Sequence, residues 1–522
     1  MIKNIKWLLL VTLTFVACNS DEEDTSGVVP EVVPAAGTAD FSKYVALGNS
    51  ITAGYADNAL FIAGQNNSYP KLLSDQFATV GGGTFTLPLM NDNLGGLLIG
   101  GFQIQNTRLI FNGSSTFNIP GTPTTDVVNH LSGYFNNMGV PGAKSFHLLA
   151  PGYGSLAGIF AGTANPYFAR FAQNNTTTVI ADAVAQTPTF FSLWIGNNDV
   201  LSYATSGGTG VNRTGNPNVA SYGGNDITDP TAFAGVYSSL LDQLTANGAK
   251  GVVANIPYVS SVPFFTTVPT NPIPATSLPA ASSAQLNQLF GAINQITTAL
   301  GQPNRFVTLV SDDNNPATIE PNNPLLIVDE TLPDLSVYIT AALTPALGAA
   351  TAGYVGNLYK QARHARNTLG NSDYILLTTR AIITPPNNIA SGAPSPFNIN
   401  GISNPLQDSR VLTADETLQI RTAVDAYNMA IKSLADAKGL AFVDANAALN
   451  DVADDGGVVF DNFHMTSAYV KGGAFGLDGV HPSARGQAYI ANKFLEAIEL
   501  KYGSVFKKYK PQDFPLSYPA GL

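Results

Sequence analysis

Short apolar runs alternate with longer segments of helical periodicity along most of this chain. The runs 44–47 and 189–195 are apolar or β-branched, and each ends at a glycine. Such runs are typical of buried strands, whereas apolar residues three and four positions apart predict helices. We expect strands over 44–47, 189–195, 251–255 and 440–444, and helices over 69–77, 231–246, 413–438 and 483–502. This alternation predicts an α/β domain with a mostly parallel sheet covered on both faces.

Two regions interrupt the alternation. Residues 79–135 are rich in Gly, Asn and Thr and predict loops or a small β excursion. Residues 268–410 are rich in Pro and Asn, with strand-like pieces at 306–310 and 325–328 and a helical piece at 337–350. A structureless loop of that length is implausible in a compact domain. We therefore predict an inserted subdomain that forms a lid or a substrate-recognition surface.

The N-terminus has the layout of an export signal. Two lysines precede an apolar run that is too short to span a bilayer, and residues 1–17 end directly before Cys18. The segment resembles the lipobox of bacterial lipoproteins, which predicts a chain lipid-anchored in the outer membrane. An ordinary signal peptide with a coincidental cysteine is the alternative. Residues 18–40 predict a flexible tether, whose acidic run 21–24 resembles a surface-export signal of Bacteroidetes lipoproteins or is simply a solvated linker.

Composition excludes several classes of protein. Only 12% of the residues are charged, the formal net charge is −11, and the sequence has no basic patch, which argues against a nucleic-acid partner. A single cysteine excludes disulfides within the chain. With 522 residues and 45% hydrophobic content, the chain can build a core by burial alone. The oligomeric state is left open.

Candidate chemistry follows two of the predicted strands. Ser50 comes just after the strand 44–47, where a helix begins, and Asn198 follows the strand 189–195. Backbone N–H groups at a helix start and a side-chain amide at the same sheet edge can stabilise a developing oxyanion. Gly139 and Gly142, in a third segment, allow close backbone approach to a ligand. Each feature alone is also what an ordinary turn contains.

A fourth segment supplies the chemistry of a base. Asp478 and His481 are three residues apart in a Gly/Pro-defined loop. At that spacing the carboxylate can hold Nδ1–H of the imidazole while Nε2 faces outward, as the base half of a serine hydrolase triad requires. We interpret the remaining histidines as structural or surface groups; they are His130, His147, His364 and His464.

The four segments, in this order, resemble the motif blocks of the GDSL or SGNH hydrolases. The matching pieces are Gly48-Asn49-Ser50, Gly142, Gly196-x-Asn198-Asp199 and Asp478-x-x-His481-Pro482. The resemblance implies Ser50 as nucleophile, His481 as general base and then acid, and Asp478 as its orienting carboxylate. It also implies an oxyanion hole made by the Ser50 and Gly142 N–H groups and the Asn198 amide, with Gly139 as the alternative glycine.

The same resemblance implies a fold and a division of the chain. The expected fold is an SGNH-hydrolase-like three-layer α/β sandwich with a large insertion. Residues 41–267 and 411–505 would form the hydrolase domain, 268–410 the insertion, and 506–522 a C-terminal tail.

The sequence around Ser50 differs at one position from the GDSL/SGNH motif and at another from the α/β-hydrolase motif. Asn49 stands where the GDSL/SGNH family usually has Asp, which keeps the shape of the side chain but loses its charge. Thr52 stands where the nucleophile motif of α/β-hydrolases has its second glycine, which counts against that family. The sequence has no metal-binding or phosphate-loop motif, so no metal and no cofactor are expected.

These observations predict a serine esterase or lipase that cleaves carboxylic esters through an acyl-enzyme on Ser50. The substrate would be a small-molecule, lipid or acylated-glycan ester. Two alternatives stay open: a carbohydrate O-acetyl esterase of the same family, and a surface glycan-binding protein on a hydrolase fold. The apolar character of 79–135 and 268–410 slightly favours an acyl ligand, although buried core explains it equally well.

Overall fold

A computed structural model describes residues 32–315, 317–454, 456–460 and 463–522. Five strands form a central sheet in the order β15-β8-β7-β1-β6, and neighbouring strands pair in parallel. The chain thus starts inside the sheet, adds one strand on one side, and then builds outward on the other. The strands are β1 (Tyr44–Gly48), β6 (Asn137–Gly139), β7 (Phe190–Trp194), β8 (Lys250–Ala254) and β15 (Ala441–Val443). The predicted α/β class with a mostly parallel sheet is confirmed.

Alternation along each strand explains why both faces of the sheet are covered. Val45 and Leu47 belong to one apolar core, whereas Tyr44 and Ala46 belong to another, because successive side chains of a strand point to opposite faces. The helices that contribute to the first core include α5 (Val179–Val184), α7 (Pro230–Thr245) and α13 (Ala414–Ala437). Those that contribute to the second are α3 (Tyr69–Ala78) and α15 (Ala484–Tyr502).

The predicted helices and strands of this domain agree with the structure to within about two residues at each end. The edge strand β6 was not predicted, because its residues Asn-Met-Gly carry no β-branched or aromatic side chain. The prediction of a strand-like piece at 306–310 is wrong. These residues form no strand, and asparagine side chains accept hydrogen bonds from backbone N–H groups there, for example Asn287 from Leu309 (2.8 Å) and Asn323 from Val310 (2.7 Å).

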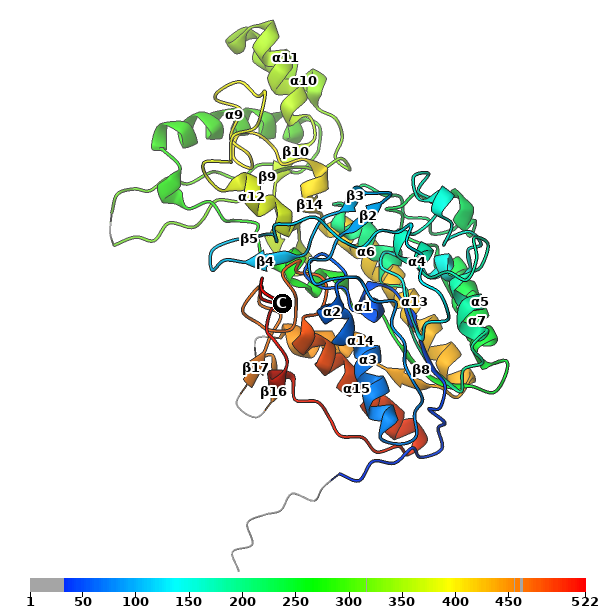
Figure 1. The fold of residues 1–522 in the computed structure, drawn as a ribbon. Helices are drawn as coiled ribbons and strands as arrows, with labels where there is room; N and C mark the ends of the chain where they lie inside the picture. Colours follow the sequence, from blue (N-terminus) through cyan, green and yellow to red (C-terminus); the bar gives the residue numbers. More distant parts are fainter. Residues whose placement is uncertain (1–31, 316, 455, 461–462) are drawn as a thin grey trace, which may run out of the picture.

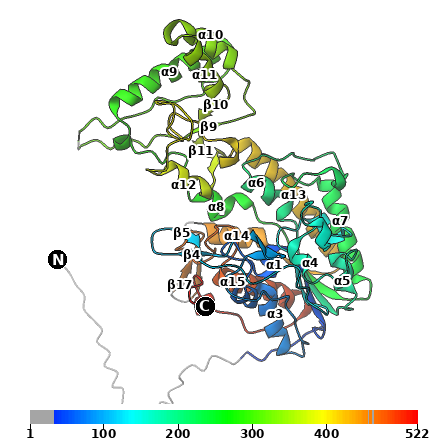
Figure 2. The same cartoon turned by 45° about the horizontal axis from the view of Figure 1, so that its top comes forward.

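Residues from about 268 to 411 form a separate lobe, green to yellow in Figures 1 and 2. Two apolar clusters in the lobe consist entirely of residues from this stretch, so the lobe has its own core. The segment coincides with the predicted inserted subdomain. Its elements are α9 (Ala280–Ala299), β9 (Leu326–Val328), α10 (Ser336–Leu347), α11 (Ala349–Tyr359), β10 (Ala362–His364), β11 (Asn367–Thr368), β12 (Asn371–Ser372), β13 (Tyr374–Ile375), α12 (Arg380–Ile383) and β14 (Val411–Leu412).

The main domain also contains short strands and helices outside the central sheet. The stretch 79–135, predicted as loops or a small β excursion, holds two antiparallel pairs, β2 with β3 and β4 with β5. The bounds of these strands are β2 (Leu97–Ile99), β3 (Phe102–Gln105), β4 (Leu109–Phe111) and β5 (Thr116–Asn118). The other short elements are α1 (Ser50–Ala53), α2 (Ile62–Asn66), α4 (Pro166–Ala169), α6 (Asn198–Thr205), α8 (Pro263–Thr266), α14 (Ala445–Ala453), β16 (Val458–Phe460) and β17 (Phe463–Met465).

The two ends of the described chain are held against the main domain. Ala35 forms an isolated β-bridge with Val505, and the N–H of Thr38 donates to the carbonyl of Tyr502 (2.8 Å). The tether predicted over 18–40 therefore does not extend to residue 40, because residues from Ala35 onward are bound. The C-terminal tail is fixed by the buried Arg108, whose guanidinium donates to the carbonyls of residues 518 and 519.

The predicted export signal 1–17, Cys18 and the acidic run 21–24 lie outside the described residues. In the described part of the chain, no helix combines the length and apolar character that crossing a membrane requires.

Candidate active site

Two neighbouring strands carry the predicted nucleophile and the predicted amide to one edge of the sheet. Ser50 is the first residue of α1 and follows β1, and Asn198 is the first residue of α6 and follows β7. β1 and β7 pair in parallel, and the direction in which strands are added reverses next to β1. In open parallel sheets, ligands bind at the carboxyl ends of the strands at such a reversal. The fold therefore places these residues where a substrate site is expected.

Three side chains form a continuous hydrogen-bonded chain at this edge. His481 Nε2 lies 2.9 Å from Ser50 Oγ, and His481 Nδ1 lies 3.0 Å from Asp478 Oδ2. A carboxylate accepts hydrogen bonds, so Nδ1 carries the proton and Nε2 is free to accept the hydroxyl proton of Ser50. The structure thus brings together the three residues that the sequence selected, although 431 positions separate Ser50 from His481.

Local backbone geometry fixes the carboxylate of Asp478. Its Oδ1 accepts from the backbone N–H groups of Val480 and His481 (2.8 Å each), and its Oδ2 accepts from the N–H of Asn58 (2.8 Å). Burial by itself raises the pKa of Asp478, but the charge of His481 and these hydrogen bonds outweigh it and lower the pKa below its usual value. The carboxylate is therefore ionised and held in position to orient the imidazole.

A second carboxyl lies behind the triad and was not singled out from the sequence. Asp57 is 1% exposed, and its Oδ1 accepts from the N–H of Leu477 in the loop that carries Asp478 (2.7 Å). Its Oδ2 is buried without a hydrogen-bond partner. Burial is the main cause that raises the pKa of Asp57 to about 7. Asp57 has a left-handed backbone (φ 50°). This conformation is a property of the structure, and no sequence pattern around Asp57 predicts it.

Two of the backbone N–H groups predicted to form an oxyanion hole are free. Within the described chain, the N–H groups of Ser50 and Gly142 have no hydrogen-bond acceptor. The N–H of Gly139, by contrast, donates to Asn137 Oδ1 (2.9 Å), and a Cβ on Gly139 would lie 2.3 Å from the backbone nitrogen of Ala53. Between the two candidate glycines, Gly142 is therefore the one with a free donor.

The amide of Asn198 is fixed by one bond and keeps one hydrogen free. Its Nδ2 donates to the carbonyl of Ala143 (2.9 Å), directly after Gly142. An amide nitrogen carries two hydrogens, so the second can point toward the space next to Ser50. The neighbouring Asp199 is fully buried and accepts from both the N–H (2.8 Å) and the hydroxyl (2.7 Å) of Ser145. These contacts hold the glycine segment and the Asn198 segment together.

The side chain of Asn49 makes two hydrogen bonds next to Ser50. Its Oδ1 caps α1 by accepting from the N–H of Ile51 (3.1 Å), and its Nδ2 donates to Asn197 Oδ1 (3.0 Å). Both side chains are buried. An amide at position 49 thus supplies a donor that a carboxylate lacks, and it links the serine segment to the segment that carries Asn198.

An apolar pocket opens beside Ser50 and His481. It lies between β7, β15, α14 and α15, with a cavity of about 110 Å³, several times the space that one water needs. Its polar lining residues include Ser50, His481 and Asn198. Its apolar wall includes Trp194, Leu201, Leu449, Val452, Ile490 and Phe494. The sequence did not predict this pocket, because its wall comes from segments far apart in the chain.

The other histidines have structural surroundings. His147 accepts a backbone hydrogen bond from Lys144 (3.0 Å), and His364 accepts one from Val307 (3.0 Å) inside the lobe. Burial lowers the pKa of both to about 4, so they are neutral near pH 7. His130 and His464 are exposed.

Comparison of the chain with protein-family models, with curated proteins and with solved structures finds no match.

Proposed function

We propose that this protein is a serine ester hydrolase of the GDSL/SGNH type that works through an acyl-enzyme on Ser50. The observation that carries the proposal is the chain of hydrogen bonds from Ser50 through His481 to Asp478, at 2.9 and 3.0 Å. A nucleophile, a base and an orienting carboxylate in this arrangement are what covalent acyl transfer requires.

The residues can divide the reaction into two halves. Ser50 Oγ attacks the ester carbonyl carbon while His481 Nε2 takes the hydroxyl proton. The resulting tetrahedral oxyanion collapses, the bond to the alcohol oxygen breaks, and His481 returns the proton to the leaving alcohol. Water then attacks the acyl-enzyme with His481 as base, which releases the carboxylic acid and restores the proton to Ser50.

The oxyanion of both intermediates would be stabilised by three donors. These are the N–H groups of Ser50 and Gly142, which have no acceptor in the described chain, and the second amide hydrogen of Asn198. Donors fixed before the reaction need no rearrangement when the charge develops, which is why loss of one such donor costs about 10²–10³-fold in kcat.

The apolar pocket favours an acyl ester over an acetylated glycan. A pocket walled by Leu449, Val452, Ile490 and other apolar groups gains from burial of methylene groups, about 0.8 kcal/mol each, whereas an acetyl group would leave most of it unfilled. A sugar ring would find few hydrogen-bond partners in the pocket. We therefore place the acyl chain in the pocket and the alcohol outside, toward the lobe.

We also propose that the protein is exported and lipid-anchored. The lipobox-like segment that ends at Cys18 supports an exported chain anchored in the outer membrane. Mass spectrometry of the membrane-bound protein, before and after Cys18→Ala, would detect the lipid or its absence.

Hydrolysis of p-nitrophenyl acetate, butyrate, octanoate and palmitate tests the activity and its chain-length preference together. We expect turnover that Ser50→Ala abolishes, with butyrate or octanoate preferred over acetate. Leu449→Trp should reduce octanoate turnover about tenfold or more and spare acetate, because it fills the pocket. The matched control is Leu418→Trp, at a 63% exposed position on α13. Equal activity of the Ser50→Ala variant would contradict the whole proposal.

A further inference from the structure

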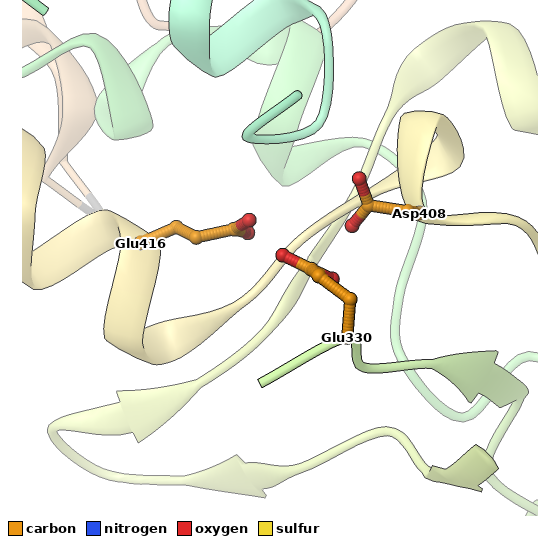
Figure 3. Close-up of side chains that lie close together, drawn as sticks. All are labelled: Glu330, Asp408 and Glu416. Carbon is orange, nitrogen blue, oxygen red and sulfur yellow. The ribbon is translucent and has the colours of Figure 1, made fainter. Parts of the chain in front are cut away.

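Three carboxylates from different segments meet where the lobe joins the main domain. Glu330, Asp408 and Glu416 each offer an oxygen, and these oxygens all lie within 4.8 Å of one another (Figure 3). We name this cluster the acidic junction. Glu330 follows β9 and Asp408 begins a 3₁₀ helix in the lobe, whereas Glu416 belongs to the first turn of α13 in the main domain. The acidic junction therefore spans both parts of the molecule.

Glu416 is buried and has an unused oxygen. The residue is 2% exposed, and its Oε2 accepts from the N–H (2.7 Å) and the hydroxyl (2.8 Å) of Thr413, as the capping box of α13 requires. Its Oε1 has no hydrogen-bond partner. Figure 3 shows the carboxylate pointing toward Glu330 and Asp408. A buried, unpartnered carboxylate oxygen is costly unless a cation or a proton joins it.

The backbone beside this oxygen leaves room for it. A Cβ on Gly208 would lie 1.8 Å from Glu416 Oε1, and Gly208 has the left-handed backbone (φ 77°) that favours glycine. Any larger residue at 208 would displace the carboxylate. The backbone at Gly208 thus approaches Oε1 closely without giving it a hydrogen-bond partner.

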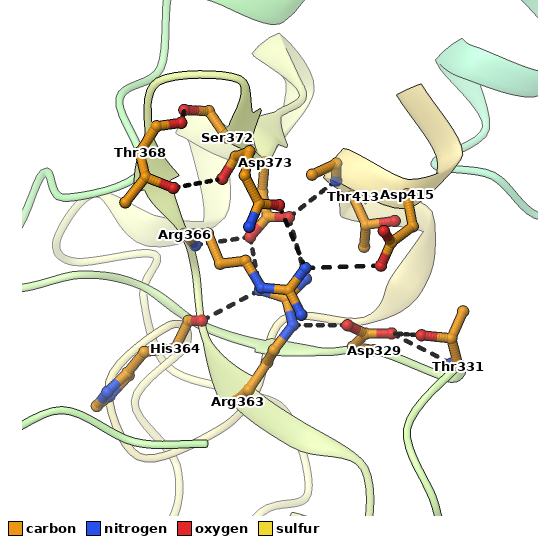
Figure 4. Close-up of polar contacts among 12 residues, drawn as sticks. Asp329, Thr331, Arg363, His364, Arg366, Thr368, Ser372, Asp373, Thr413 and Asp415 are labelled. Atoms are coloured by element: carbon orange, nitrogen blue, oxygen red, sulfur yellow. Dashed lines mark hydrogen bonds and ion pairs between the residues drawn. The ribbon is translucent and has the colours of Figure 1, made fainter. Parts of the chain in front are cut away.

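Among the described residues, no lysine, arginine or histidine forms an ion pair with the acidic junction. Asp408 Oδ1 is also buried without a partner, and none of the ion pairs among the described residues includes Glu330, Asp408 or Glu416. The buried Arg363 is fully engaged by Asp329 (2.6 Å) and Asp373 (2.6 Å) (Figure 4).

We propose that the acidic junction binds one Ca²⁺ ion, which fastens the lobe to the main domain. Carboxylate oxygens are the ligands that hard divalent cations prefer. Ca²⁺ bonds of 2.3–2.6 Å place opposite ligand oxygens about 4.6–5.2 Å apart, so oxygens within 4.8 Å fit around one ion. Mg²⁺ demands bonds of about 2.0–2.1 Å, which place opposite oxygens only about 4.0–4.2 Å apart, so oxygens separated by 4.8 Å would have to move closer. Waters would complete the Ca²⁺ shell.

Calcium titration of the full chain, stripped with EDTA, tests the proposal without reference to ester hydrolysis. We expect isothermal titration calorimetry to give one site per chain and Tm to rise by about 3 °C or more at saturating Ca²⁺. Mg²⁺ should produce a smaller rise at the same concentration. Absence of both heat and a Tm shift at about 10 mM Ca²⁺, above the Kd of weak calcium sites, would overturn the proposal.

Two ligand variants and one control locate the ion. Glu416→Gln and Asp408→Asn should each weaken Ca²⁺ binding about tenfold or more and remove most of the Tm rise. Asp408→Asn leaves the capping box of α13 intact, so it remains informative if Glu416→Gln does not fold. Asp415→Asn is the control, because this exposed acid lies next to Glu416 outside the cluster. Wild-type affinity in both ligand variants would assign the ion elsewhere and refute the site.

Discussion

Asp478, which is hydrogen-bonded to His481, and Glu416 at the acidic junction are both carboxylates withdrawn from water, and their surroundings are opposite. Asp478 accepts from three backbone N–H groups and from His481, and its pKa is lowered. Glu416 keeps one oxygen without a partner and faces two further acids, and its pKa is raised. Hydrogen-bond donors around a buried carboxylate stabilise its charged form. A buried carboxylate without such donors is stabilised only by a bound cation or by a proton.

Arg363 shows a third way to stabilise buried carboxylates, which is an ion pair with a buried arginine. It neutralises Asp329 and Asp373 in the lobe (Figure 4). Asp329 and Glu330 are adjacent in the chain, yet the first reaches an arginine and the second an acidic cluster. Burial alone therefore does not decide the state of a carboxylate; the groups that face it do.

The largest effect should come from removing the charge of Asp478. Asp478→Asn keeps the size of the side chain but presents an amide to His481, which disfavours the tautomer that accepts the Ser50 proton. We expect kcat for p-nitrophenyl butyrate to fall by about 10⁴-fold with little change in folding. Asp436→Asn, at an exposed site on α13, should leave kcat unchanged. A loss of less than tenfold in Asp478→Asn would assign the orienting role to another group.

Removal of Arg363 should give the largest loss of stability. Arg363→Met leaves Asp329 and Asp373 buried without a counter-charge, which costs about 3–5 kcal/mol in the free energy of unfolding. Denaturant unfolding measures the loss. Arg366→Met is the matched control, because its pair with Asp415 is exposed and worth at most about 1 kcal/mol. Equal losses in the two variants would mean that Arg363 acts through packing alone.

Asp57 should make stability depend on pH in a defined window. Its pKa is about 7 in the folded chain, so the folded protein keeps a proton that the unfolded chain loses near pH 4. The free energy of unfolding should therefore fall as the pH rises from about 4 to about 7, by an amount on the order of 4 kcal/mol. The groups that face Asp57 are Asp478, Arg108 and His481.

Asp57→Asn tests this window, because an amide keeps the acceptor for Leu477 and cannot titrate. Denaturant unfolding at about pH 4.5 and pH 7.5 should show a smaller pH dependence in Asp57→Asn than in the unmodified chain. Asp75→Asn, at an exposed site, should retain the full dependence. An unchanged slope in Asp57→Asn would place the titrating group elsewhere.

The smallest effect is expected at an exposed ion pair. Lys432 and Asp436 pair one helical turn apart on α13, with half or more of each side chain exposed. Lys432→Ala should change the free energy of unfolding by less than about 0.5 kcal/mol. Thermal unfolding of Lys432→Ala and Arg363→Met under the same conditions compares an exposed ion pair with a buried one. A loss comparable to that of Arg363→Met would show that exposure does not determine the value of a pair here.

Periodicity and local chemistry were enough to predict the main elements. The strands before Ser50 and Asn198 and the helices α7, α13 and α15 were predicted because each has strong apolar periodicity or clear end signals. The edge strand β6 was missed and the piece 306–310 was misassigned, since in both cases distant partners decide the backbone pairing. β6 is a strand because it pairs with β1. In the segment 306–310, backbone N–H groups donate hydrogen bonds to asparagine side chains of α9 and of the loop before β9.

The sequence by itself determined which residues could carry the chemistry. Asp478 and His481 are close in the chain, so their contact follows from a short loop, and Ser50 and Asn198 are marked by their places after predicted strands. Only the tertiary structure decided the rest. The distance from Ser50 to His481, the apolar pocket, the unpartnered oxygen of Asp57 and the meeting of three acids at the acidic junction all join residues far apart in the chain. Periodicity reports which face of an element is buried, and it carries no record of which distant side chain is buried against it.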